Sequence, residues 1–147
     1  MATPPAPTPD LADSLRLAVT RLARRLRQHA DVSASPTQVA ALSTIERRGP
    51  LTLGELAACE RVRPPTVTAA VSRLEARDLV RRTPDPTDRR VARVEITAAG
   101  RKLLARTRSR KTAFLAQRLG ALDARERAVL AEAVVVLDHL LDEEGRP

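Results

Sequence analysis

The sequence predicts a mostly α-helical fold with one small β-hairpin, and three observations support this fold class. Apolar residues recur at intervals of three and four in several separate segments, which is the spacing of amphipathic helices. Two short strand-forming segments, 79–82 and 92–96, flank a turn rich in proline and aspartate. Positive charge is concentrated in residues 61–93, where nine arginines and four acids supply a net +5 of the chain's +8.

The chain is predicted to form one domain, residues 11–147, because 147 residues are too few for two independent cores. Residues 1–10 hold four prolines, no positively charged side chain and no apolar segment, so we expect a disordered tail rather than a signal peptide. No run of about 18 apolar residues is present, which argues against a membrane-spanning helix. The cytoplasm is therefore the expected compartment.

The helices near both ends of this domain have wide apolar faces. Leucine and valine recur at helical spacing in residues 11–30, with Asp10 as the expected N-cap, and an Asp123-x-x-Glu126 capping box begins the last helix. The apolar surface of the last helix is too wide for one neighbour, so we predict homodimerisation through residues 11–30 and 98–143. The predicted interface residues are Leu11, Leu15, Leu22, Leu130, Val134, Leu137 and Leu141.

Residues 35–97 are predicted to form a DNA-binding lobe that begins with a helix-turn-helix. Capping boxes at Ser35 and Thr52 start a second and a third helix, which end at Gly49 and near Cys59. About five residues later, Pro64 suits the start of a fourth helix. Short helices joined by a tight turn in this order indicate a helix-turn-helix.

The fourth helix has the composition of a helix that contacts bases. Val67, Val71 and Leu74 share one face, and the opposite face carries small or hydrogen-bonding side chains that can approach base edges and phosphates. Arginines at the hairpin tip suit a narrow minor groove, where the negative potential is enhanced. The predicted DNA-binding residues are Arg63, Pro65, Thr66, Thr68, Ser72, Arg73, Arg89 and Arg90.

A long helix is predicted to follow the hairpin. It runs from Ala98 to about Leu119, with Thr97 as its cap and Gly120 at its end. Its middle, residues 105–112, is almost wholly polar, which indicates a strut between two lobes.

The charge alone is weak evidence for DNA binding. Arginine-rich faces are usually solvated, and 24 arginines with two lysines also fit a GC-rich coding bias. The alternative is a winged-helix protein-interaction module without sequence-specific DNA binding, although clustered charge is unusual at the centre of a protein interface. No catalytic arrangement, Gly-rich phosphate loop or metal-ligand cluster is recognisable, and no cofactor or metal is expected. Because Phe114 is the only aromatic residue, double-stranded DNA is expected rather than stacked single strands.

The order of these elements resembles the MarR family of bacterial winged-helix transcription regulators. The resemblance covers residues from about 11 to 142 and rests on TLGELAACERVRPPTVTAAVSRLEARDLVRR, on DPTDRRVARVEITAAG and on the flanking helices. Its most specific part is Asp88-Arg89-Arg90 followed by Ile96-Thr97-x-x-Gly100. It implies a winged helix-turn-helix DNA-binding lobe joined to a helical dimerisation lobe. A dimer would present two such helices to a palindromic site, about ten base pairs apart.

The resemblance also implies roles for particular residues. The helix at residues 64–77 would enter the major groove and Arg90 the minor groove, while Asp88 would stabilise the hairpin by pairing with an arginine, for which we expect Arg73. Many members repress transcription and release DNA when a small, often anionic aromatic compound binds between the DNA lobe and the dimer helices. The oxidant-sensing branch uses a cysteine near the first helix, whereas Cys59 ends the third, so peroxide sensing is not expected.

Overall fold

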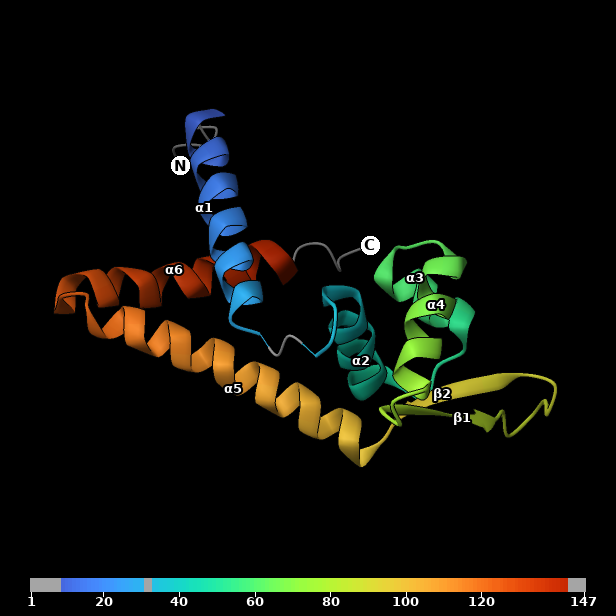
Figure 1. Cartoon of the computed structure of the whole chain (residues 1–147). Coiled ribbons are helices and arrows are strands. Elements are labelled where there is room, and N and C mark those ends of the chain that lie inside the picture. The colour runs from blue at the N-terminus through green and yellow to red at the C-terminus, as the bar shows by residue number, and fades with distance from the viewer. Residues whose placement is uncertain (1–8, 31–32, 143–147) are drawn as a thin grey trace. The chain divides into compact units, whose positions relative to one another are not determined.

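The computed structural model describes residues 9–30 and 33–142, which form helices and one antiparallel hairpin (Figure 1). The chain divides into two compact units, one ending at Lys111 and the other beginning at Thr112, within the polar segment of the long helix. In chain order the elements are α1 (Pro9–Gln28), α2 (Pro36–Arg48), α3 (Leu53–Glu60), α4 (Pro64–Glu75), β1 (Val80–Pro84), β2 (Ala92–Ile96), α5 (Ala98–Gly120) and α6 (Ala124–Asp142). The predicted mostly helical fold class with one hairpin is confirmed.

The start of α1 corrects the prediction for the N-terminal tail. The helix begins at Pro9, so residues 9 and 10 are helical and Asp10 lies in the first turn instead of capping it. Proline is tolerated at a helix start because its fixed φ suits the helix and its missing N–H would have no partner there. A carboxylate in the first turn is also favourable beside the positive end of the helix dipole. The disorder predicted for residues 1–8 lies outside the described residues.

Three predicted capping boxes are formed as expected. In each box, the side-chain oxygen at the N-cap accepts the backbone N–H three residues later, and the Glu or Gln there accepts the N-cap N–H. These reciprocal bonds satisfy N–H groups that a helix start otherwise leaves without partners. The boxes start α2, α3 and α6 and consist of Ser35 with Gln38, Thr52 with Glu55, and Asp123 with Glu126.

The core of the first unit is built from α2, α3, α4, the hairpin and the start of α5. The apolar face predicted for α4 lies in this core, with Val71 and Leu74 fully buried. Leu42 of α2, Leu56 of α3 and Leu103 of α5 are also almost completely buried. Burying such side chains contributes roughly 1.5–3 kcal/mol each to folding, so the core holds the exposed face of α4 at a fixed orientation.

The hairpin is attached to the helix-turn-helix by a pair of backbone hydrogen bonds that the sequence analysis did not predict. Strands β1 and β2 pair from Val80 opposite Ile96 to Pro84 opposite Ala92. Leu51, between α2 and α3, then forms an isolated bridge with Val94, with N···O distances of 3.1 and 2.7 Å. Val94 is fully buried, and the bridge holds β2 beside the N-terminal end of α3.

The second unit comprises the end of α5 and all of α6. No residue of α6 is buried within this chain, although the helix carries many valines and leucines. Among the described residues, no helix combines the length and apolar character needed to cross a membrane.

Gly100 is predicted to be essential for packing the start of α5 on the hairpin. A Cβ atom at this position would lie 2.2 Å from the carbonyl oxygen of Leu79 and 2.7 Å from Cγ1 of Ile96. We expect Gly100→Ala to lower the free energy of unfolding by about 2–3 kcal/mol, because overpacking forces the backbone to shift. Urea denaturation monitored by circular dichroism measures this change.

The matched control is Gly54→Ala in α3, where the nearest atom to an added Cβ is Thr52 Oγ1 at 3.9 Å. Its free energy of unfolding should stay unchanged or rise by up to about 1 kcal/mol, because alanine favours helix. Equal effects of the two substitutions would show that the close approach at Gly100 has no energetic importance.

Candidate DNA-binding surface

The solvent-facing side of α4 carries the residues predicted to contact DNA. Pro65, Thr66, Thr68, Ser72 and Arg73 are all exposed, whereas the opposite side of the helix is buried in the core. This division follows from the helical period, which places residues three and four apart on one face. The Thr68 hydroxyl donates to the carbonyl oxygen of Pro64 at 3.0 Å, so its lone pairs remain able to accept a hydrogen bond from a base edge.

The turn of the hairpin is organised around Asp85, which the sequence analysis placed in the turn without a role. One carboxylate oxygen of Asp85 accepts the N–H and hydroxyl of Thr87, at 2.8 and 2.6 Å, and the N–H of Asp88 at 3.1 Å. The other oxygen accepts from Arg93 Nε. The Thr87 hydroxyl above all, and then Arg93, hold the pKa of Asp85 well below its usual range. Asp85 is therefore an anion with nearly all of its acceptor positions filled.

Arg93 connects this turn to the helix-turn-helix, and the sequence analysis also missed it. Its Nη1 donates to the carbonyl oxygen of Pro50 and to Glu55 Oε2, both at 3.1 Å. The ion pair with Asp85 raises the pKa of Arg93. The pKa of Glu55 is lowered, first by the N–H of Thr52 and also by the charge of Arg93. An Asp-Pro-Thr-Asp sequence is typical of a side-chain-stabilised turn, but nothing local to Arg93 indicates its partners.

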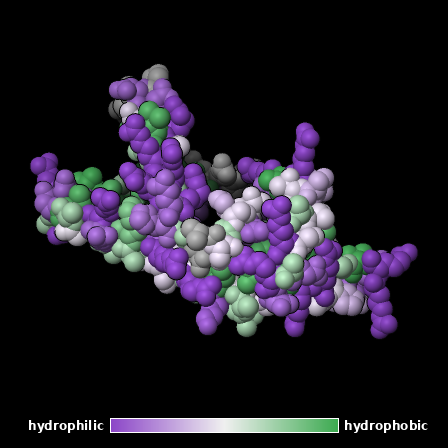
Figure 2. Space-filling model, viewed as in Figure 1, coloured by the Kyte–Doolittle hydropathy of each residue, from purple (hydrophilic) through white to green (hydrophobic). Residues whose placement is uncertain are grey.

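Asp88 pairs with Arg90, and this corrects the prediction that Arg73 would be its partner. Asp88 Oδ1 accepts the backbone N–H and Nε of Arg90, both at 3.0 Å, and Oδ2 accepts Nη2 at 3.2 Å. These bonds lower the pKa of Asp88. The Arg90 side chain is nevertheless 90% exposed, so the pair orients a guanidinium that faces solvent. In Figure 2 the hairpin end, at the right of the view, projects hydrophilic side chains outward.

The nine arginines of residues 61–93 fall into two groups. Arg81, Arg82, Arg90 and Arg93 pair with acids, and Arg77 donates to the carbonyl oxygen of Ser33. The guanidinium groups of the others make no hydrogen bond or ion pair within the described ranges 9–30 and 33–142, so their charge remains available to an anionic partner. These four are Arg61, Arg63, Arg73 and Arg89.

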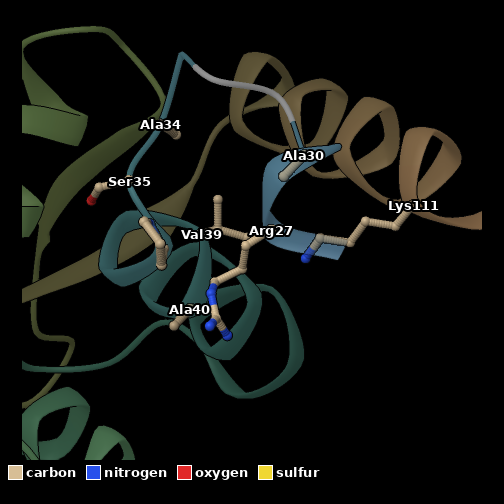
Figure 3. Close-up of a pocket in the computed structure, with 8 residues that line it drawn as sticks. Arg27, Ala30, Ala34, Ser35, Val39, Ala40 and Lys111 are labelled. Carbon is tan, nitrogen blue, oxygen red and sulfur yellow. The ribbon is translucent and has the colours of Figure 1, made fainter. Parts of the chain in front are cut away.

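A cavity of about 600 Å³ lies apart from this surface, within the first unit (Figure 3). Its lining is mainly apolar, with Val39 at its α2 side, and it includes the cations Arg27 and Lys111. Such a combination suits a small apolar molecule that carries a negative charge. The other lining residues are Ala30, Ala34, Ser35, Pro36 and Ala40.

The residues predicted for the dimer interface are mostly exposed within a single chain. Leu137 is half-buried, and the other six have 37–70% of their surface exposed. Further apolar side chains on the same two helices are exposed as well, namely Leu17 and Val19 on α1 and Val129, Val135, Val136 and Leu140 on α6.

Comparison with known proteins agrees with this architecture. The profile of the MarR family matches residues 34–92. An HTH-type transcriptional regulator of Mycobacterium tuberculosis is 38% identical over 134 residues, which cover 90% of this chain and 94% of the relative.

Two solved structures are similar over nearly the whole chain. A transcriptional regulator from Pseudomonas aeruginosa superposes with a TM-score of 0.81 at 37% identity, covering 90% of this chain and 95% of that one. A MarR family protein from Bacillus stearothermophilus gives a TM-score of 0.74 at 25% identity, covering 90% and 93%. With its winged helix-turn-helix and this degree of identity, the chain belongs to the MarR family of DNA-binding transcriptional regulators.

Proposed function

We propose that the protein is a homodimeric repressor that binds an inverted-repeat operator, with α4 in the major groove and the hairpin, or wing, in the minor groove. The observation that carries this proposal is the joint placement of an exposed polar α4 face and an arginine-bearing wing on one packed core. Two contact elements held by one core can contact neighbouring grooves without further ordering, which reduces the entropic cost of binding.

The chemistry of the α4 face supports base contacts in the major groove. Arg73 is exposed and has no charged partner among the residues that the structure describes, and arginine can donate two hydrogen bonds to the O6 and N7 of guanine. Thr66 and Ser72 offer short hydroxyl groups that allow the helix backbone to approach the bases closely. We assign base contacts to Arg73 and Thr66, and backbone contacts to Arg63 and Arg89.

The wing supports a contact in the minor groove. Asp88 orients Arg90 through three hydrogen bonds and leaves 90% of its side chain exposed. Arg93, through Pro50 and Glu55, holds the base of the wing against the helix-turn-helix. A cation that is already oriented fits a narrow minor groove, where the electrostatic potential is most negative.

Dimerisation is supported by the apolar faces of α1 and α6. A small domain rarely leaves so many leucine and valine side chains in water, and α6 buries none of its residues within the chain. A second copy is the simplest partner, because most soluble oligomers are symmetric homo-oligomers. Two copies related by a two-fold axis would match the two halves of an inverted repeat.

We also propose that the cavity beside Arg27 and Lys111 binds a small anionic aromatic compound and that its binding releases DNA. The cavity is lined by Pro36, Val39 and Ala40 of α2, and α2 packs against α4. A ligand acts on DNA binding only if it favours one arrangement of these helices over another. The cavity gives such a ligand direct contact with the helix that supports α4.

The test of this function is selection of bound sequences from random duplex DNA by the purified protein at two salt concentrations. An enriched inverted repeat, with half-sites about ten base pairs apart, is the expected result. Recovery of unrelated sequences that are lost at the higher salt would contradict sequence-specific binding. Salt-insensitive binding to a protein partner, without a DNA shift, would favour the interaction-module alternative.

We predict separable effects for Arg90 and Arg73 in operator-binding titrations. Arg90→Ala should weaken binding and reduce the slope of log K against log salt by about one for each bound protomer, because one groove-inserted cation is lost. Arg73→Ala should cost on the order of 1–3 kcal/mol and relax the preference at one operator position.

Arg81→Ala is the control, because Arg81 is an exposed arginine of the same hairpin that also pairs with an acid, Glu95, but lies in strand β1 and not in the turn of the wing. It should change the affinity and the salt slope little. A normal salt slope for Arg90→Ala would exclude the minor-groove role, and an equal loss on all sequences for Arg73→Ala would reassign that residue to the DNA backbone.

The ligand proposal predicts that benzoate, used as a simple aromatic carboxylate, binds the free protein and weakens operator binding. Arg27→Ala or Lys111→Ala should weaken benzoate binding about tenfold, because each removes a charge-assisted contact. Isothermal titration calorimetry measures the affinity. Lys102→Ala, an exposed lysine on α5 outside the cavity lining, should bind benzoate normally; an equal loss in this control would show only non-specific charge attraction.

A further inference from the structure

Arg61, between α3 and α4, has a backbone conformation that favours glycine. Its φ and ψ are 51° and 40°, in the left-handed region, and it caps the C-terminus of α3. Its N–H bonds to the carbonyl oxygen of Ala58, and the N–H of Val62 bonds to that of Ala57, both at 3.2 Å. Glycine is the usual residue at such a helix end because it has no Cβ to strain the backbone. The backbone therefore gives no reason for an arginine here.

Asp78, a second residue with positive φ, is a type of residue that suits this conformation better than arginine does. Asp78 has φ of 55° after α4, and aspartate tolerates this region because its short polar side chain can bond locally. The long Arg61 side chain is exposed, and its guanidinium makes no hydrogen bond or ion pair with the part of the chain that the structure describes. Strained residues persist mainly where a function uses them.

The start of α4 lacks the donors with which a helix usually holds a phosphate. Free N–H groups in the first turn normally bind such an anion, but Pro64 and Pro65 have none, and the N–H of Thr66 bonds to the carbonyl oxygen of Arg63 at 3.0 Å. Arg63 is the N-cap and makes no side-chain capping bond. Side chains must therefore supply most of the contacts to a phosphate beside this end of α4.

We propose that Arg61, acting with Arg63, binds a phosphate of the DNA backbone at the N-terminal end of α4. This inference rests on the proposed function and adds a contact beyond the base-contacting face. Arg61 and Arg63 lie in the segment between α3 and α4, whereas the hairpin follows the C-terminal end of α4 (Figure 1). The phosphate contact would therefore hold α4 at the end opposite the wing. Phosphate contacts set the position of a protein on DNA and carry no sequence information.

The test is the substitution Arg61→Gly, which removes the cation and relieves the backbone strain together. The melting temperature should stay the same or rise by about 2–4 °C, because glycine suits the left-handed region. Operator affinity should fall about three- to tenfold at 0.1 M salt, and the salt slope should decrease by about one for each bound protomer. The sequence preference should not change, and Arg61→Lys should keep most of the slope.

Asp78→Gly is the matched control, because it also places glycine at a position with positive φ and does not remove a positive charge. It should bind DNA at least as tightly as the parent protein. Specific binding by the parent protein, with an unchanged affinity and slope in Arg61→Gly, would overturn the phosphate contact alone. No DNA binding by the parent protein would overturn both proposals. Non-specific binding whose slope still falls in Arg61→Gly would support the phosphate contact and overturn the sequence-specific function.

Discussion

The contacts of Arg93 join the wing to the helix-turn-helix, and the geometry of the candidate DNA surface depends on them. One guanidinium reaches Asp85 in the wing turn, Glu55 at the start of α3 and the carbonyl oxygen of Pro50. A two-stranded hairpin is only marginally stable alone. Here it gains this charged connection together with the backbone bridge between Leu51 and Val94, so the wing is held as part of the same body as α4.

The arginines of this region serve two physical purposes. Arg93, which is half-buried beside Asp85 and Glu55, holds parts of the fold together, whereas Arg90 pairs with Asp88 and still keeps 90% of its side chain exposed. Arg73 and Arg89 keep their charge in water. Net charge alone does not distinguish these arginines, because one that is half-buried beside two acids, as Arg93 is, contributes little to the field that an approaching DNA experiences. The arginines of residues 61–93 that have no partner among the described residues lie on α4, on the turn before it and on the wing.

Much of the fold could be predicted because it is determined by residues close in sequence. The two partners of each capping box are three positions apart, and the buried face of α4 follows from spacings of three and four. The partners of Arg93 lie eight, 38 and 43 positions away, and no local pattern reports such distances. The prediction for Asp88 failed in the opposite way, because the distant Arg73 was expected as its partner and the structure pairs it with Arg90, two residues away. Closing so short a loop costs less entropy than bringing α4 to the wing. The predicted contacts with bases, ligand and second subunit depend on molecules outside the chain.

The lowered pKa values of the two wing acids have a consequence for regulation. A carboxylate whose pKa is lower in the folded protein than in the unfolded chain stabilises the fold fully when the pH is above the unfolded pKa. This stabilisation is lost as the pH falls through the folded pKa. For Asp85 and Asp88 this loss lies below the ordinary pKa range of an aspartate. Arginine does not lose its proton in the physiological range, and residues 80–96 contain no histidine. Proton uptake by Asp85 and Asp88 is therefore not expected to move the turn of the wing in the pH range of a cell.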